Sequence, residues 1–147
     1  MSFTFEIREE SDLSALLAVR WRNLYPDKVV DPSISKETDG AEGTIHFTAV
    51  RSDGRIGGCV TLAEELKHER PRRMRWLGVD ESWRGRGVGS SLVKACLEIS
   101  GHATSDIWCN ARLIAIDFYR SLGFETKGRM FNIGDIGPHY YMFKDLL

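Results

Sequence analysis

The stretch Trp83-Arg84-Gly85-Arg86-Gly87-Val88-Gly89 places two arginines and three glycines within seven residues. Glycine weakens any helix or strand that contains it, so three alternating glycines call for a reason. The stretch lies between a predicted strand at residues 74–80 and a predicted helix at residues 87–100. The first amides of a helix have no partner inside it, and together with the helix dipole they favour an anion. The sequence therefore predicts either an anion-binding loop or a flexible, solvated turn.

Two nucleotide-binding motifs fit this stretch poorly. A Walker A loop ends in Gly-Lys-Ser/Thr, whereas Gly89 is followed by Ser90 and Ser91. The Rossmann fingerprint read from Gly85 needs Gly or Ala at position 90, and it belongs to a first βαβ unit. Asp106 does lie near the distance expected for the ribose-binding acid of that fingerprint. A Rossmann-type nucleotide protein is therefore kept only as an alternative.

The composition is that of a single soluble domain. The 147 residues can bury one core but are few for two ordinary domains, so we expect one domain over residues 1–147. The formal net charge of -1 gives no reason to expect a nucleic acid or an anionic membrane as a partner. No apolar stretch approaches the roughly 18 residues of a membrane span, and the N-terminus is unlike a signal peptide. We expect a cytoplasmic protein that is a monomer or a homodimer.

The three cysteines are a second indication that the protein is cytoplasmic. Cys59, Cys96 and Cys109 are odd in number, have no CxxC spacing and lie among apolar neighbours. This pattern predicts buried, reduced thiols.

Hydrophobic periodicity predicts a mixed α/β chain. We expect strands at residues 3–9, 45–50, 56–62, 74–80, 106–110, 124–133 and 140–143, and helices at residues 13–24, 87–100 and 113–122. Asp12 is expected to cap the first helix. Residues 26–43 are expected to form a long loop with one short helical turn, and residues 67–73 a charged connection between strands.

Three segments resemble the GNAT superfamily of N-acetyltransferases. Residues 84–89 match the pattern Arg/Gln-x-x-Gly-x-Gly/Ala with which that family holds the pyrophosphate of acetyl-CoA. Ala115, Tyr119 and Gly123-Phe124 are similar to its A-x-x-x-Tyr-x-x-x-Gly-Phe segment, and GDIGPHYYMFKDL, from Gly134, resembles the end of small bacterial members. The resemblance implies a single-domain acyl-CoA N-acyltransferase fold. This is a mixed, mostly antiparallel sheet flanked by helices, with a splay between its two central strands.

The resemblance also implies acetyl-CoA as the cosubstrate, and no metal. The strand before the loop would offer backbone groups to the pantetheine arm and to the acetyl carbonyl, and the loop would wrap the pyrophosphate. The residues so implied are Leu77, Gly78, Val79, Arg84, Gly85, Arg86, Gly87, Val88, Gly89, Ser90, Asn110, Arg112, Ala115 and Phe118. Many members carry an asparagine seven residues before the tyrosine, where this chain has Arg112. Either Asn110 or Arg112 takes over that contact.

Tyr119 stands where many relatives keep the general acid that protonates the sulfur of CoA. The alternative for Tyr119 is a core aromatic beside Phe118. The general base stays open between His139, Glu64, Glu65 and a chain of waters. We expect direct attack by the amine in a ternary complex rather than an acyl-cysteine, because a strand cysteine such as Cys109 with no adjacent histidine is usually inert.

The function implied is acetyl-CoA-dependent N-acetylation of a primary amine on a small molecule or a protein. A non-catalytic acyl-CoA-binding sensor that kept the loop is the alternative. The net acidic segment 27–42 either attracts a cationic amine or is a solvated loop. A basic run either meets the 3′-phosphate of the cofactor or is solvated; its members are Lys67, Arg70, Arg72, Arg73 and Arg75.

Overall fold

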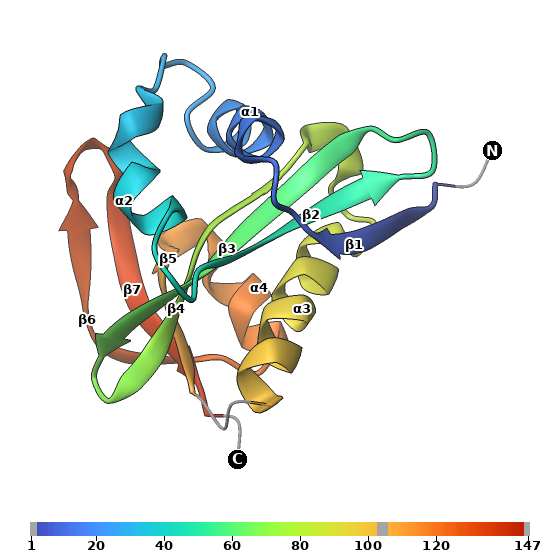
Figure 1. Ribbon diagram of the computed structural model, residues 1–147. Helices are drawn as coiled ribbons and strands as arrows, with labels where there is room; N and C mark the ends of the chain where they lie inside the picture. The colour runs from blue at the N-terminus through green and yellow to red at the C-terminus, as the bar shows by residue number, and fades with distance from the viewer. Residues whose placement is uncertain (1–2, 103–105, 146–147) are drawn as a thin grey trace. The chain divides into compact units, whose positions relative to one another are not determined.

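The computed structural model describes residues 3–102 and 106–145. In this part of the chain, seven strands form one mixed sheet in the order β1-β2-β3-β4-β5-β7-β6 (Figure 1). The chain divides into two compact units that interleave along the sequence. The first unit is Met1–Glu64 with Met74–Cys96, and the second is Glu65–Arg73 with Leu97–Leu147. Two strands, β3 and β4, and one helix, α3, continue from one unit into the other.

The first unit begins with an antiparallel ladder of β1 (Phe5–Glu9), β2 (Ile45–Arg51) and β3 (Ile56–Lys67). Between β1 and β2 lies helix α1 (Leu13–Leu24). Its N-cap is Asp12, whose carboxylate accepts hydrogen bonds from the amides of Ser14 and Ala15 at 3.0 and 3.3 Å. The predicted first strand, helix cap and hairpin are therefore confirmed.

Two helices cover opposite faces of this ladder (Figure 1). Neighbouring residues of β3 point to opposite faces because a strand is pleated. A Cβ on Gly58 would lie 3.1 Å from the side chains of Val88 and Leu92 in helix α3 (Val88–His102). The next residue, Cys59, packs with Leu16 of α1. Gly58 thus allows α3 to pack closely on one face, while α1 covers the other.

The segment after α1 contains two short helical pieces, η1 (Pro32–Ser35) and α2 (Lys36–Asp39), where one turn was predicted. A buried ion pair holds them. Arg20 of α1 is 0% exposed and donates to both carboxylate oxygens of Asp39 at 2.9 and 3.0 Å. Its guanidinium also donates to the hydroxyl oxygens of Ser35 at 3.1 Å and Thr61 at 2.8 Å. Burial alone would raise the pKa of Asp39, but the hydrogen bonds of Arg20 and Ser35 and the charge of Arg20 lower it.

His46 of β2 joins the same network. Its Nδ1 lies 2.8 Å from the Thr61 hydroxyl, and its Nε2 lies 3.4 Å from the Asp39 carbonyl oxygen. A carbonyl can only accept, so Nε2 carries the proton and Nδ1 accepts from Thr61. Burial lowers the pKa of His46 from its ordinary value of 6.5. The imidazole is therefore held in its neutral form.

The predicted charged connection at residues 67–73 is wrong. Strand β3 continues to Lys67 and β4 (Arg70–Val79) begins three residues later, so His68 and Glu69 form the turn between them. Both turn residues have positive φ, 49° and 69°, as a two-residue hairpin of type I′ requires. Basic side chains can lie in this strand because they pack on aromatic rings. The guanidinium carbon of Arg70, for example, is 3.6 Å from the centre of the Phe143 ring.

The second unit carries the remaining strands. The start of β4 pairs in parallel with β5 (Ile107–Arg112), through Arg72↔Ile107 and Arg73↔Trp108. Strand β7 (Gly137–Lys144) runs antiparallel to β5 and to β6 (Glu125–Ile133). It starts three residues earlier than predicted, directly after the short helix η4 (Gly134–Ile136). The helix predicted at residues 113–122 is a 3-10 turn, η3 (Leu113–Ala115), followed by α4 (Ile116–Ser121).

Two of the remaining sequence predictions concern thiols and membrane spans. Cys59, Cys96 and Cys109 are buried and form no disulfide, and burial raises the pKa of each thiol to about 12. The prediction of buried, reduced thiols is confirmed. Within residues 3–102 and 106–145, no helix is long and apolar enough to cross a membrane.

The buried ion pair gives the first testable prediction. Asp39→Ala leaves the Arg20 charge buried and unpaired, so we expect a loss of about 3–5 kcal/mol in the free energy of unfolding, measured by urea denaturation. The matched control is Asp53→Ala. It removes the exposed carboxylate that accepts a hydrogen bond from Arg51 at 2.7 Å. We expect little change in the control, because water screens an exposed pair. Equal losses in the two variants would contradict the assignment.

His46 gives a pH dependence of stability. Below about pH 6.5 the unfolded chain takes up a proton at His46 that the folded chain resists, because the pKa in the folded state is lowered. The free energy of unfolding should therefore fall as the pH drops from 7.5 to about 5.5, and His46→Gln should flatten this slope. Urea denaturation across that range measures it. Identical slopes in the wild type and the variant would exclude His46 as the source.

Candidate functional site

Asp80, the residue after β4, fixes the start of the glycine loop, which we define as residues 83–89. Its carboxylate accepts from Arg22 at 2.9 and 2.8 Å and from the Asn23 amide at 2.8 Å. Its own amide donates to the Gly57 carbonyl, and its carbonyl accepts from the Trp83 amide, both at 2.8 Å. Burial would raise the pKa of Asp80, but Arg22 and Asn23 lower it. Asp80 therefore holds α1 through its ionised carboxylate, and β3 and the loop through its backbone.

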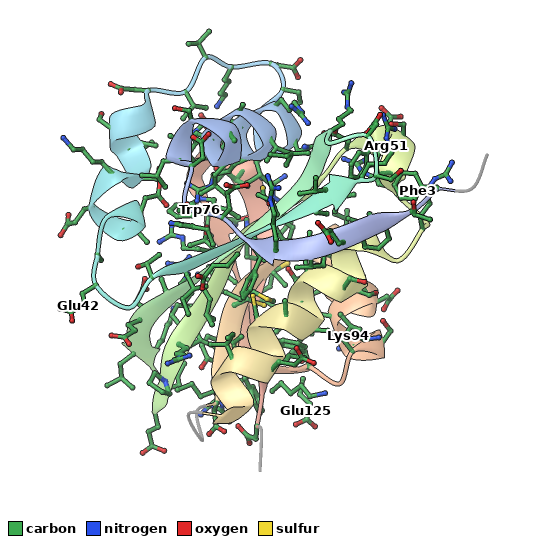
Figure 2. All side chains as sticks on the ribbon, turned by 45° about the vertical axis from the view of Figure 1, so that its right-hand side comes forward. Phe3, Glu42, Arg51, Trp76, Lys94 and Glu125 are labelled. Carbon is green, nitrogen blue, oxygen red and sulfur yellow. The ribbon has the colours of Figure 1, made fainter. Side chains whose placement is uncertain are left out.

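Trp83 holds the loop to the first unit from inside. It ends the short helix η2 (Glu81–Trp83) and is 1% exposed. Its ring meets the ring of Phe3 edge to face at 5.1 Å, and the Arg51 guanidinium carbon lies 5.4 Å from its centre. Figure 2 shows Phe3 and Arg51 at the same end of the β1–β2 ladder. A Cβ on Gly57 would overlap the Trp83 ring, so Gly57 is required for this packing.

Two of the loop glycines are required by backbone conformation. Gly85 and Gly87 have φ angles of 74° and 83°, in the left-handed region that other residues rarely adopt. A Cβ on either would meet nothing within 4 Å, so the requirement is conformational rather than steric. The first amide bonded within α3 is that of Ser91, which donates to the Gly87 carbonyl at 3.0 Å. The amides of residues 88–90 thus have no partner inside the helix, as an anion site needs.

The two arginines of the loop have neighbours within the first unit. Arg84 donates from Nε to the Val79 carbonyl at 3.1 Å, so that carbonyl already accepts a hydrogen bond. The guanidinium carbon of Arg86 lies 4.6 Å from the centre of the Phe3 ring. Both arginines are exposed, and they add positive charge beside the exposed Gly85 and Gly87. This arrangement suits a phosphate group.

Sequence reasoning missed an irregular residue in β4. Trp76 has φ 57°, which is exceptional for a bulky residue in a strand, and nothing in the sequence signals it. The guanidinium carbons of Arg20 and Arg75 lie 4.2 and 3.8 Å from its ring, and Trp21 meets it edge to face at 6.0 Å. Figure 2 shows Trp76 beside helix α1. The predicted cofactor-binding residues 77–79 follow directly after Trp76.

Gly78 has a packing role that the sequence did not reveal. A Cβ at this position would lie 3.0 Å from the Cβ of Asn23, so only glycine lets α1 approach β4 this closely. Leu77 and Val79, which flank Gly78 in the strand, are half-buried. Helix α1 and the strand before the loop are therefore closely packed.

The second unit holds the other predicted site residues. In β5, Asn110 pairs with Tyr141 and Arg112 pairs with His139 across the ladder. Within the described residues, no group donates a hydrogen bond to the buried Oδ1 of Asn110. A buried amide oxygen without a donor is costly, so Asn110 is suited to accept a hydrogen bond from a ligand. The half-buried Arg112 is the other residue considered for that contact.

Tyr119 lies in α4 and is 8% exposed. Its ring meets Phe118 edge to face at 5.1 Å and Phe124 at 5.4 Å. The ring therefore belongs to the aromatic core, as one of the two sequence interpretations expected. Ala115 lies at the start of the same helix and is half-buried. The core position of the ring leaves open what the hydroxyl does.

The structure brings the predicted residues together in two groups. The first unit contains the strand and loop residues Leu77, Gly78, Val79, Arg84, Gly85, Arg86, Gly87, Val88, Gly89 and Ser90. The second unit contains Asn110, Arg112, Ala115, Phe118 and Tyr119.

The candidate bases differ in their surroundings. Glu64 is exposed, and its carboxylate fills the place that a Cβ on Gly43 would take. Both carboxylate oxygens of Glu65 accept a hydrogen bond from Nη1 of Arg73 at 3.2 Å. His139 is 4% exposed and its Nδ1 donates to the Gly137 carbonyl at 2.8 Å, so the lone pair of the neutral ring is on Nε2.

Cys109 and the residue types that bind metals are the remaining groups of the described chain. Burial raises the pKa of Cys109 to about 12, so its thiol stays protonated at neutral pH and is a poor nucleophile. Among residues 3–102 and 106–145, no three His, Cys, Asp or Glu side chains are grouped to hold a metal ion.

Comparison with known proteins places this geometry in a family. The model of the acetyltransferase (GNAT) domain matches residues 42–126, more than half of the chain. An uncharacterised N-acetyltransferase of Bacillus subtilis (strain 168), YitI, is 31% identical over 133 residues, which cover 87% of this chain and 88% of that protein.

Solved structures show the same fold. An acyl-CoA N-acyltransferase from Pseudomonas aeruginosa superposes with a TM-score of 0.78 at 20% identity, covering 97% of this chain and 99% of that one. An aminoglycoside 6′-N-acetyltransferase complexed with coenzyme A superposes with a TM-score of 0.76 at 17% identity, covering 97% of both chains. The expected fold class is thereby confirmed, and the expected splay between its central strands stays a prediction. The chain belongs to the GNAT superfamily, and its enzyme class is that of the acetyl-CoA-dependent N-acetyltransferases.

Proposed function

We propose that this chain transfers the acetyl group of acetyl-CoA directly to a primary amine of a small molecule or a protein. The observation that carries the proposal is the glycine loop. Gly85 and Gly87 in the left-handed region, exposed arginines beside them and unpaired amides at the start of α3 form an anion site on a rigid base. A pyrophosphate is the anion that the GNAT motif in this loop implies. The same proposal includes a single domain and a cytoplasmic location.

The strand before the loop supplies the next part of the site. In the proposed reaction, the neutral amine attacks the thioester carbonyl carbon, a C–N bond forms and negative charge gathers on the carbonyl oxygen. A backbone amide of residues 77–79, directly after the left-handed Trp76, stabilises that oxygen. The Val79 carbonyl already accepts one hydrogen bond, from Arg84.

Collapse of the intermediate needs two proton transfers. The attacking nitrogen loses a proton to a base, and the C–S bond breaks to give a thiolate that needs a proton. We assign the second step to the hydroxyl of Tyr119, supported by its place in the family motif. For the first step the neutral Nε2 of His139 and a water chain are the candidates, since the Glu65 carboxylate is bonded to Arg73 and Glu64 packs on Gly43.

The orphaned oxygen of Asn110 supports this residue, rather than Arg112, for the asparagine contact. Its Oδ1 accepts no hydrogen bond within the described residues, and an amide N–H of the pantetheine arm would satisfy it. We therefore propose Asn110 rather than Arg112 for this role, with Ala115 and Phe118 as apolar neighbours of the cofactor.

Gly87→Ala tests the loop. We expect CoA affinity to fall by about tenfold, equal to 1.4 kcal/mol, because the left-handed backbone that presents the amides is disfavoured for alanine. Gly54→Ala is the matched control: Gly54 also has positive φ, 88°, and open space at its Cβ, but it lies in the β2–β3 turn. Both variants should lose similar stability, and calorimetric titration should show weaker CoA binding for Gly87→Ala alone. Unchanged affinity in Gly87→Ala would contradict the assignment.

Tyr119→Phe tests the chemistry. We expect kcat for acetyl transfer to fall by about 10²–10⁴-fold, as for loss of a general acid, while the Kd of acetyl-CoA stays the same. An assay of thiol release over a library of primary amines measures the rate. A wild-type protein that binds acetyl-CoA but acetylates none of the amines would favour the non-catalytic sensor. A fully active Tyr119→Phe would leave Tyr119 as a core aromatic.

A further inference from the structure

We propose that the buried Arg20–Asp39 ion pair is a positioning device that holds Trp76 of β4 in its left-handed conformation. This inference rests on the proposed function, because the backbone that follows Trp76 is the part of β4 assigned to the thioester. Arg20 and Asp39 are thus positioning residues for acetyl transfer. They have no assigned contact with either substrate.

The conformation of Trp76 needs an explanation. At φ 57° its Cβ is crowded by its own backbone, and a bulky residue adopts this conformation only where the surrounding structure imposes it. Such strain is concentrated at functional sites. A left-handed residue also turns the chain within a strand, so the conformation of Trp76 sets the direction of Leu77–Val79.

Besides Arg75 of β4 itself, three contacts from other elements impose the conformation. The Arg20 guanidinium carbon lies 4.2 Å from the centre of the Trp76 ring, and Trp21 meets the same ring edge to face at 6.0 Å. From the strand alongside, Cys59 donates from Sγ to the Trp76 carbonyl at 3.6 Å. Helix α1 therefore fixes the side chain of Trp76, and β3 fixes its backbone.

The Arg20 side chain is itself immobilised. It is 0% exposed, it binds both oxygens of Asp39, and Ser35 and Thr61 accept further hydrogen bonds from the same two Nη atoms. A planar guanidinium can bond a carboxylate in its plane and pack its face on an aromatic ring, which neither lysine nor an aliphatic side chain can do. Because a buried ion pair is often no more stabilising than a well-packed apolar pair, its retention here is explained better by geometry than by stability.

The glycine loop is held separately. Asp80 and Trp83 fix the loop through Arg22, Asn23 and Phe3, and none of these contacts passes through Arg20 or Asp39. Loss of the ion pair should therefore disturb the left-handed conformation of Trp76 while the loop stays intact. The proposal thus predicts a separation of effects, in which the rate of transfer falls and CoA affinity does not.

The test compares Arg20→Met with Val19→Ala. Val19 is a neighbouring core residue of α1, so its truncation destabilises the same helix without touching the ion pair. At positive φ the amide and Cα hydrogens of a residue are close, so Trp76 should give a strong intraresidue HN–Hα NOE in the wild type. We expect Arg20→Met to lose this NOE and to lose kcat on the order of tenfold to hundredfold, with CoA affinity retained. Val19→Ala should keep the NOE, the kcat and the CoA affinity of the wild type.

Asp39→Asn is the second variant, because it keeps the shape and part of the hydrogen bonding should Arg20→Met fail to fold. It should reproduce the loss of kcat and NOE in weaker form. The proposal would be overturned if Arg20→Met or Asp39→Asn folds and retains the NOE. It would also be overturned if kcat falls as much in Val19→Ala as in Arg20→Met. The NOE requires no turnover, so an inactive wild-type protein would refute the proposed function and leave the positioning claim to be decided by the NOE.

Discussion

The carboxylate of Asp80 fixes the point at which strand β4 becomes the glycine loop. Two side chains of α1, Arg22 and Asn23, meet on it, and its own backbone joins it to Gly57 of β3 and to Trp83. Without this residue the left-handed glycines of the loop would have no fixed base, because each glycine gives the chain freedom rather than direction. The loop is thus flexible in composition but held firmly where it begins, as a preorganised anion site must be.

The two parts of the first unit that we propose to act on acetyl-CoA are held by different means. The loop depends on Asp80 and on the buried ring of Trp83, whereas the conformation of Trp76 in β4 depends on its contacts with Arg20, Trp21 and Cys59. Gly78, between them, lets α1 lie close to the strand. Helix α1 therefore supports both parts, and changes in α1 should affect binding and transfer through different residues.

Local patterns in the sequence predicted those features that local physics decides. The alternation in β1, the Asp12 cap and the glycine loop all follow from neighbours a few residues apart. Features that depend on distant partners were missed. Residues 67–73 looked like a charged connection because their aromatic partners, among them Phe143, are far along the chain. The left-handed Trp76 and the buried charge of Arg20 break the usual preferences of their residue types, so no local pattern predicts them.

The central claim is that the loop amides bind the pyrophosphate of CoA, and a titration of isotope-labelled protein with CoA tests it most directly. The account predicts that the largest amide shifts on adding CoA fall on Gly85–Ser90, and that pyrophosphate alone moves the same amides. A protein that binds CoA while these amides keep their shifts would contradict it.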